Sequence, residues 1–382
     1  MYVTAHEELV AVLRRLQRNV ESGLPDQSDA PMKVPAAWYR DDDLYQKEID
    51  EIFLKVPLLV AITPDVPEPG DFQAFEIVGR PILVVRGNDG RARTFFNICR
   101  HRGARVTQLP CGKAKSFMCQ YHYWTYSREG KLDGIPEKAT FGDVDATGLI
   151  ELPTEEIAGL IFAKLDPEAS IDARAWLGGM LPTLEALDLA TMYPYRVFSK
   201  MESPNWKLAA DGYLDGYHIG YLHRNTIGVK AITNRNTYDL FGPHVRIGFA
   251  NKKIAEWDAT EPATRYMPEF MSLVNYIFPN CSLSGGHGDT LQLSRLFPGP
   301  TVDRSITTQQ QYFRDPVEGD MVRIAEDKRV TYEAVVRDED CATIFGIGSA
   351  LPAMGDGHVL FGRNEKANQH LHQQIAHLTG VR

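Results

Sequence analysis

The feature that most constrains this chain is a short basic segment at residues 99 to 122, "CRHRGARVTQLPCGKAKSFMCQYH". Cys99 and His101 are separated by one residue, Cys119 and His122 by two, and seventeen residues lie between these halves. A zinc finger places its two cysteines in one pair and its two histidines in another. Here each half supplies one thiol and one imidazole. This arrangement suits two loops that hold a binuclear iron–sulfur cluster, with two thiolates on one iron and two imidazoles on the other.

Two other interpretations of the segment are a structural zinc site and buried thiols with incidental histidines. The spacing favours the cluster over both. The third cysteine, Cys111, follows Pro110 in a turn between the halves, and we expect it to be an inert thiol. The chain has five cysteines and no secretory signal, so a disulfide scaffold is not expected.

Composition limits the class of protein. A chain of 382 residues with 43% hydrophobic and 24% charged residues has room for two globular domains. A net charge of −9 argues against nucleic-acid binding, which needs a basic face. The start of the chain lacks a signal-peptide pattern, and no apolar run approaches the roughly 18 residues of a membrane span. We therefore expect a soluble, cytoplasmic protein.

Hydrophobic periodicity predicts a mixed fold. Helices are expected at 9–20, at 41–53, at 205–223 and along 316–351. Strands are expected at 74–98, as a hairpin around "NDG", and at 237–250, 290–297 and 305–313. The pattern indicates an α+β protein in which a small all-β domain lies near the N-terminus of a larger domain with an antiparallel sheet.

A second group of metal-binding side chains lies in "DGYLDGYHIGYLH". His218 and His223 are five residues apart, and Asp215 stands three before His218. On a helix with a slight irregularity near Gly220, both imidazoles reach one metal. Two histidines and a carboxylate form the facial triad of non-haem Fe(II) sites. Taken alone, a histidine pair at this spacing is weak evidence for a metal site, and two histidines buried in the hydrophobic core would be the better explanation.

"NICRHRGARV" and "CQYHYWTYSREGKLDGIP" resemble the cluster-binding segments of Rieske non-haem iron oxygenases, specifically the terminal oxygenase α subunit of aromatic-ring-hydroxylating dioxygenases. The resemblance implies a Rieske [2Fe–2S] cluster on Cys99, His101, Cys119 and His122. The chain departs from the family's usual "CPYHGW" at Gln120 and Tyr123. These departures concern the shape of the loop.

The same resemblance implies a mononuclear Fe(II) on His218 and His223, with "NWK" upstream as a further match. It gives Asp215 the role of a bridging carboxylate, which hydrogen-bonds a ligand histidine and, in a trimer, a Rieske histidine of the next subunit. The third ligand would come from "VRDEDCATIFGIGSAL", where the resemblance selects Asp340 and Asp338 is the next choice. The competing interpretation is that these acids cap a helix.

The resemblance also implies the overall plan: an N-terminal helix and linker at 1–40, a Rieske domain at 41–155 and a helix-grip catalytic domain at 156–382. Electrons would pass from NAD(P)H through a separate reductase, with or without a ferredoxin, because the chain lacks a nucleotide-binding glycine motif. The assembly would be a homotrimer or an α3β3 hexamer, without nucleic acid or membrane. Its substrates would be O₂ and an aromatic molecule.

Two other functions remain open at this point. A Rieske monooxygenase or oxidative demethylase shares every ligand named above, and a pure electron-transfer Rieske protein would lack the mononuclear iron. Asp211 is expected either near Asp215 or as an ordinary polar helix residue. His370 and His372 alternate as strand residues do and are expected at a surface or interface. His244 and His287 could face the pocket, but their spacing does not indicate that they do.

Overall fold

A computed structural model describes residues 5–142 and 148–381, which form two compact units. The larger unit comprises Met1–Ile52, Leu177–Leu187 and Thr191–Arg382, and the smaller unit comprises Phe53–Trp176 and Asp188–Ala190. The domain prediction placed residues 41–52 with the Rieske segment. In the structure they pack within the larger unit, and the predicted limits stay a prediction.

The smaller unit is built from short antiparallel strands. Five form one sheet in the order β10-β5-β4-β3-β6, and two three-stranded sheets have the orders β11-β12-β2 and β7-β8-β9. The strands are β2 (Leu58–Ile62), β3 (Asp71–Ile77), β4 (Arg80–Arg86), β5 (Ala92–Phe96), β6 (Cys111–Lys113), β7 (Phe117–Met118), β8 (Thr125–Tyr126), β9 (Leu132–Gly134), β10 (Glu151–Leu152), β11 (Thr154–Ile157) and β12 (Leu160–Ala163). The short helix α3 (Ala173–Leu177) ends at the boundary between the units.

The predicted hairpin around "NDG" is present, as β4 and β5 pair from Ile82↔Phe96 to Arg86↔Ala92. The first apolar run contains a second hairpin, because β3 turns back into β4 at Val78 and Gly79, both with positive φ. Side chains from these strands pack with the cysteine segment into one core that includes Phe72, Leu83 and Phe95. The sheet thus supports the loops that carry the four predicted cluster ligands.

The larger unit is centred on a seven-stranded antiparallel sheet with the order β13-β19-β18-β17-β16-β15-β14. Its strands are β13 (Tyr193–Ser203), β14 (Thr237–Phe241), β15 (His244–Ala250), β16 (Met271–Ile277), β17 (Cys281–Gly285), β18 (Thr290–Pro298) and β19 (Ser305–Phe313). A separate pair joins β1 (Met32–Pro35) to β20 (His358–Phe361). The strands predicted at 237–250, 290–297 and 305–313 are confirmed, and the fold is α+β as expected.

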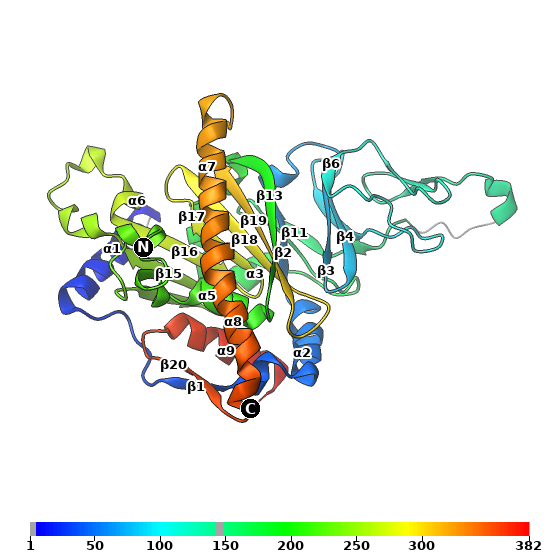
Figure 1. Cartoon of the computed structure of the whole chain (residues 1–382). Coiled ribbons are helices and arrows are strands. Elements are labelled where there is room, and N and C mark those ends of the chain that lie inside the picture. Colours follow the sequence, from blue (N-terminus) through cyan, green and yellow to red (C-terminus); the bar gives the residue numbers. More distant parts are fainter. Residues whose placement is uncertain (1–4, 143–147, 382) are drawn as a thin grey trace. The chain divides into compact units, whose positions relative to one another are not determined.

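Helices flank this sheet, and Figure 1 shows α7 and α8 as one long rod across it. The predicted N-terminal helix is confirmed as α1, which buries Val12, Leu13 and Leu16 in a shared core with Leu273 of β16. The helices are α1 (Ala5–Ser22), α2 (Asp42–Glu48), α4 (Leu181–Glu185), α5 (Trp206–Leu214), α6 (Met267–Phe270), α7 (Asp320–Ala334), α8 (Ala342–Ala350) and α9 (Lys366–Thr379). Among the described residues, no helix has both the length and the apolarity needed to cross a membrane.

The prediction of one helix over 205–223 is wrong in its extent. Helix α5 ends at Leu214, and Asp215 has an extended conformation, with φ −80° and ψ 113°. A short 3₁₀ turn then spans His218–Gly220. The turn brings the chain close to its neighbours, since a Cβ on Gly216 would lie 2.7 Å from the Asn236 side chain. The break therefore lies earlier than the irregularity expected near Gly220.

His370 and His372 were expected, from their strand-like alternation, at a surface or interface, and the structure places them elsewhere. Both belong to helix α9 and are buried, with 8% and 0% of their surface exposed. The Nε2 atom of His372 lies 3.0 Å from Asp211 Oδ1 and 2.9 Å from the Tyr39 hydroxyl. Alternation at a spacing of two occurs by chance in a polar helix, and here tertiary contacts decided the structure.

A buried ion pair ties residues 41–52 to α5. The Lys207 ammonium lies 2.7 Å from Glu48 Oε1, and neither side chain is exposed. The Trp206 indole N–H also donates to Glu48, at 2.7 Å. Removing either charge would leave the other buried and uncompensated, which strongly destabilises a fold. The "NWK" sequence thus fixes the start of the helix that leads to the predicted iron ligands.

Candidate metal centres

Two similar loops of the smaller unit present the predicted cluster ligands. The amide of Cys99 donates to the carbonyl of Ala104, and the Cys99 carbonyl accepts from the amide of Gly103. The second loop repeats these bonds, since Cys119 N donates to Trp124 O and Cys119 O accepts from Tyr123 N. Each loop is therefore a tight turn that closes behind its cysteine and carries its histidine near the tip.

Gly103 and Tyr123 occupy equivalent places in these turns. Their φ angles are +79° and +55°, in the left-handed region that glycine adopts at little cost. A tyrosine at such an angle carries a steric penalty. The departure from "CPYHGW" at this position therefore keeps the shape of the loop and adds local strain.

The four side chains form a thiol pair and an imidazole pair. Cys99 and Cys119 are buried, and the Cys99 Sγ lies 3.2 Å from the Tyr126 hydroxyl. The rings of His101 and His122 are half-buried, with centroids 4.6 Å apart. Paired thiols beside paired imidazoles fit the donor set of a Rieske cluster. Cys111, by contrast, is exposed on β6 opposite Gln73.

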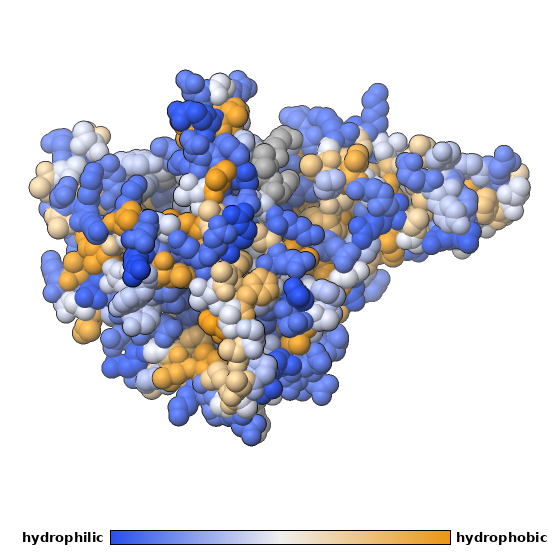
Figure 2. All heavy atoms as spheres, viewed as in Figure 1, coloured by the Kyte–Doolittle hydropathy of each residue, from blue (hydrophilic) through white to orange (hydrophobic). Residues whose placement is uncertain are grey.

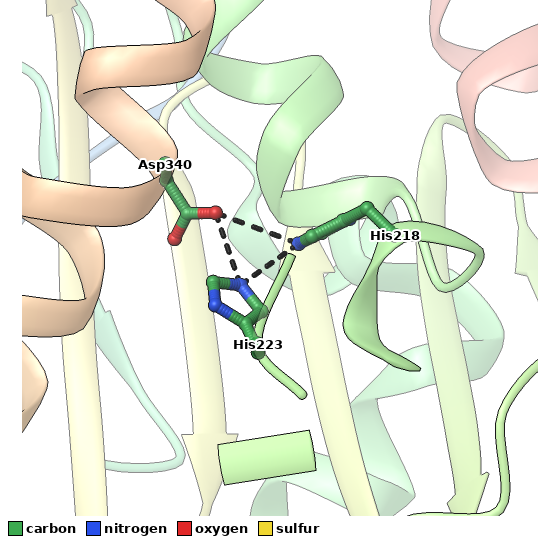
Figure 3. A group of neighbouring side chains, drawn as sticks. All are labelled: His218, His223 and Asp340. Carbon is green, nitrogen blue, oxygen red and sulfur yellow. Dashed lines mark hydrogen bonds and ion pairs between the residues drawn. The ribbon is translucent and has the colours of Figure 1, made fainter. Parts of the chain in front are cut away.

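In the larger unit, the side chains of His218, His223 and Asp340 point toward one another, as Figure 3 shows. The two Nε2 atoms lie 3.0 Å apart, and Asp340 Oδ1 lies 3.5 Å from His218 Nε2 and 3.1 Å from His223 Nε2. The histidines come from the irregular segment after α5. Asp340 comes from a π-helical stretch, Val335–Cys341, between α7 and α8. Such π-helical turns occur frequently at functional sites.

These separations fit one metal ion bound on one face. Bonds of about 2.1 Å at right angles separate ligand atoms by about 3.0 Å. Two imidazole nitrogens and one carboxylate are the donor set of non-haem Fe(II) sites with open positions. The three residues therefore fit a mononuclear iron.

Hydrogen bonds orient both imidazoles from behind. His218 Nδ1 lies 3.1 Å from Asp215 Oδ2, and His223 Nδ1 lies 2.5 Å from Glu339 Oε2. Carboxylates in these positions fix the tautomer of a ligating histidine and raise its basicity. The contact of Asp215 with His218 is the one that the resemblance implied. The role of Glu339, which also accepts from the Thr226 hydroxyl at 2.9 Å, was missed.

The electrostatics of the group suit a cation. Burial lowers the pKa of His218, but its contacts with Asp215 and Asp340 outweigh burial and raise the pKa to about 9. Burial alone would raise the pKa of Asp340, whereas the two histidines bring it below its ordinary value. The carboxylates thus hold protons on the imidazoles, and a bound metal would replace those protons.

The structure separates the two candidates for the third ligand. The side chain of Asp338 is 56% exposed and pairs with Arg337 at 2.7 Å. Asp340 joins the histidines, and Glu339 between them reaches behind His223. Successive residues on a helix point about 100° apart. Three acids in a row therefore take three different environments, which is the signal that could have suggested a role for Glu339.

Asp211 lies one turn before Asp215, and its hydrogen-bond partners belong to other segments of the larger unit. It accepts from the Tyr39 hydroxyl at 2.8 Å and contacts His372, and its backbone carbonyl accepts from Asn368. Burial and the charge of Asp211 raise the pKa of Tyr39 well above its usual value. This network joins α5 to α9 and holds the helix end that precedes the histidines.

Two cavities meet at Asp340. One, of about 280 Å³, is lined mainly by apolar side chains such as Ile347 and Leu360 and also borders Asp215 and His218. The other, of about 30 Å³, lies on the sheet side and is lined by residues that include Tyr213 and Thr307. The triad can therefore be reached from two sides with different chemical character.

Known families match both parts of the chain. Residues 190–380 match the family model for the ring hydroxylating alpha subunit (catalytic domain), and residues 57–153 match that for the Rieske [2Fe-2S] domain. The second match contains the predicted cluster ligands, and the first contains the histidine and carboxylate triad.

Relatives with described activities are similar over about half of their length. The α subunit of 2-aminobenzenesulfonate 2,3-dioxygenase from Alcaligenes sp is 32% identical over 196 residues, which are 49% of this chain and 50% of that protein. The oxygenase subunit of carnitine monooxygenase from Escherichia coli (strain K12) is 33% identical over 199 residues, 50% of this chain and 52% of that protein.

Solved structures share the fold over nearly the whole chain. A quaternary ammonium Rieske monooxygenase in complex with L-carnitine has a TM-score of 0.78 at 20% identity and covers 93% of this chain and 97% of its own. Naphthalene 1,2-dioxygenase from Rhodococcus sp. bound to indole has a TM-score of 0.75 at 20% identity, with 97% and 98% covered.

Proposed function

We propose that this chain is the terminal oxygenase component of an aromatic-ring-hydroxylating system. The proposal proceeds from the fact that the chain belongs to the ring-hydroxylating α-subunit family and carries that family's Rieske domain. The observation that carries the proposal is the triad of His218, His223 and Asp340, with both imidazoles oriented by carboxylates, in one chain with paired thiols and imidazoles. A pure electron-transfer protein would have no use for the triad.

The residues would divide the work as follows. Cys99, Cys119, His101 and His122 would hold the [2Fe–2S] cluster, and the triad would hold the iron. When bound, the two groups supply single-electron transfer and O₂ activation, with electrons that come from NAD(P)H through a reductase, with or without a ferredoxin. Asp215 would fix the orientation and protonation of His218 through its 3.1 Å contact. In an oligomer it would also be the bridge toward the next subunit's cluster.

The two cavities at Asp340 suit different roles. The cavity beside Asp215 lies on the side where the bridging carboxylate stands, so we assign it to the approach of a neighbouring Rieske domain. The cavity lined by Tyr213 and Thr307 lies between α5, the π-helical stretch and the sheet. We assign this sheltered side to the substrate, where side chains exclude water from the reacting carbon.

An oligomer is part of the proposal, as a homotrimer or an α3β3 hexamer. Figure 2 shows apolar side chains gathered on the face of α8 and β20. Ile347 and Leu360 are 43% and 61% exposed there and line the cavity that contains Asp215. Exposed apolar groups around a functional cavity are typical of protein interfaces. We place the assembly in the cytoplasm.

A second candidate is a Rieske monooxygenase or oxidative demethylase. The cavity on the sheet side is about 30 Å³, room for about two water-sized groups. This size favours the entry of a substrate end as small as a methyl group over a whole aromatic ring. The similarity to carnitine monooxygenase supports the same alternative.

Labelled oxygen tests the proposal. The purified chain, supplied with a surrogate reductase, NADH and ¹⁸O₂, is offered aromatic acids, aromatic hydrocarbons and methylated amines. The dioxygenase predicts a product with two labelled atoms, and the monooxygenase or demethylase predicts one labelled atom or a dealkylated product. A chain with two irons, all in the cluster, and no labelled product with any of these would contradict both and favour electron transfer.

A further inference from the structure

A cavity with polar walls lies at the hairpin of β17 and β18. Its volume is about 150 Å³, and its lining runs from the loop at 285–289 across the large sheet to Lys328 and Tyr332 of α7. It shares no described lining residue with the two cavities that meet at Asp340. Register places Gln292 and Gln311 side by side on one face of the sheet, because they pair across β18 and β19. The two amides therefore belong to one wall of the cavity.

These two glutamines leave hydrogen-bond acceptors unpaired. Gln292 and Gln311 are only 7% and 4% exposed, and the Oε1 of each is buried without a hydrogen bond. In Gln292 the other end of the amide is used, since Nε2 donates to the Leu293 carbonyl at 3.5 Å. Buried polar atoms are nearly always paired. The two oxygens therefore indicate an occupant that donates hydrogen bonds.

The spacing of the glutamines matches a single NH₂ group. A planar NH₂ group directs its two N–H bonds about 120° apart, and with N···O distances of about 2.9 Å it reaches two acceptors about 5 Å apart. Neighbouring side chains in a row across adjacent strands lie at about that spacing, as Gln292 and Gln311 do. A hydroxyl has one proton to donate and would pair with only one of the two oxygens.

The charges around the cavity favour a neutral occupant. An anion would set further acceptors against the two glutamine oxygens. A cation would meet the ammonium of Lys328 in the lining, and burial together with two nearby arginine charges lowers the pKa of His287 there to about 4. The acid of the lining, Asp289, is exposed and accepts from the Tyr266 hydroxyl at 2.9 Å. Its charge is therefore solvated and paired at the rim.

The rest of the lining suits a carbonyl group and an apolar ring. Lys328 is half-buried, and its ammonium can donate to a carbonyl oxygen. Met267, Pro268 and Met271 supply an apolar wall. A cavity of about 150 Å³ has room for one benzene ring.

We propose that this cavity binds a small neutral primary carboxamide, whose NH₂ group donates to Gln292 and Gln311 and whose carbonyl accepts from Lys328. The proposal adds a binding site to the proposed oxygenase function and does not require that the bound molecule reach the iron. A ketone would leave both glutamine oxygens unpaired, and a carboxylate would set negative charge against them. An amidinium would meet Lys328 with like charge.

Binding of four probes of the same planar shape tests the proposal. Benzamide, acetophenone, benzoate and benzamidinium share one ring and differ in the donors and charge of one end. Calorimetric titration of the metal-loaded chain, under anaerobic conditions and without reductant, gives each Kd. We expect benzamide to bind at least about tenfold more tightly than each of the other three.

Variants locate the contact. Gln292→Leu and Gln311→Leu are each expected to weaken benzamide binding about tenfold and to leave acetophenone binding within about twofold. The matched control is Gln310→Leu. Gln310 is 5% exposed and its Oε1 is also buried without a hydrogen bond, but it lies on the opposite face of β19. Its replacement should leave benzamide binding within about twofold.

Several results would overturn the carboxamide site. These are acetophenone binding within about twofold of benzamide, tighter binding of benzoate or benzamidinium, and losses in Gln292→Leu and Gln311→Leu no larger than in Gln310→Leu. No binding of benzamide would mean that only water fills the cavity. The probe series on the wild-type chain decides the matter even where a variant fails to fold. Iron content and labelled product, which test the oxygenase function, are independent of these affinities.

Discussion

Glu339 offers a sharp test of how the triad is held, because it acts on a proposed iron ligand without touching the iron position. Its Oε2 atom lies 2.5 Å from His223 Nδ1 and accepts from Thr226 at 2.9 Å. The Nε2 atom of the same ring faces Asp340 at 3.1 Å. The carboxylate therefore fixes which ring nitrogen carries the proton and which is free to bind metal.

Glu339→Leu removes that acceptor. Loss of an outer contact of this kind costs about 10- to 100-fold in metal affinity, or roughly 1.4 to 2.8 kcal/mol. Glu339→Gln retains an oxygen that accepts from Nδ1–H and is expected to lose less. Asp338→Asn is the matched control, since Asp338 is the neighbouring acid and pairs outward with Arg337.

Competition with an iron chelator measures the affinity, and the visible absorption of the Rieske cluster shows that the smaller unit is intact. The order of affinity should be wild type and Asp338→Asn, then Glu339→Gln, then Glu339→Leu. An affinity of Glu339→Leu within about twofold of wild type would refute the claim that this carboxylate orients His223.

Three further outcomes follow from local features. Cys111→Ser should retain the visible absorption of the cluster, because Cys111 is exposed on β6, and a colourless protein would show that the wrong cysteines were chosen. Tyr123→Gly should raise the free energy of unfolding by about 1 kcal/mol, because the residue has φ +55°, and a lower value in denaturant titration would contradict the strain. The pKa of His287 is about 4 in the folded chain and about 6.5 in the unfolded chain. Between these two pH values the unfolded chain binds one more proton than the folded chain, so the free energy of unfolding decreases as the pH falls from about 6.5 to about 4. His287→Gln should reduce this slope by about 1.4 kcal/mol per pH unit, and an unchanged slope would contradict it.

Periodicity and ligand spacing predicted much of this structure. Apolar residues at helical intervals identified α1, and alternation identified β14, β15, β18 and β19. Both patterns arise because one face of a helix or strand packs against the core, so the apolar positions can be recognised in a short stretch of sequence. The spacing of the four predicted cluster ligands is a local signal of the same kind, since each predicted pair lies within one turn of the chain.

The errors arose where distant contacts decide the backbone. The segment after α5 reads as a continuous helix, but its path depends on the side chain of Asn236 beside Gly216. The burial of His372 depends on Asp211 and Tyr39, which are remote in sequence. A π-helical turn has no clear pattern in the sequence, so the run of three acids indicates that they face different ways, but the partner that each one faces could be seen only in the structure.

The iron content of Asp340→Ala tests the central claim most directly. Wild-type protein, purified without oxygen and supplied with iron, should hold three irons per chain, two in the cluster and one on the triad. Asp340→Ala should hold two and keep the cluster's visible absorption, whereas Asp338→Ala should hold three. An Asp340→Ala protein that retains three irons, or a wild type that never exceeds two, would contradict the account.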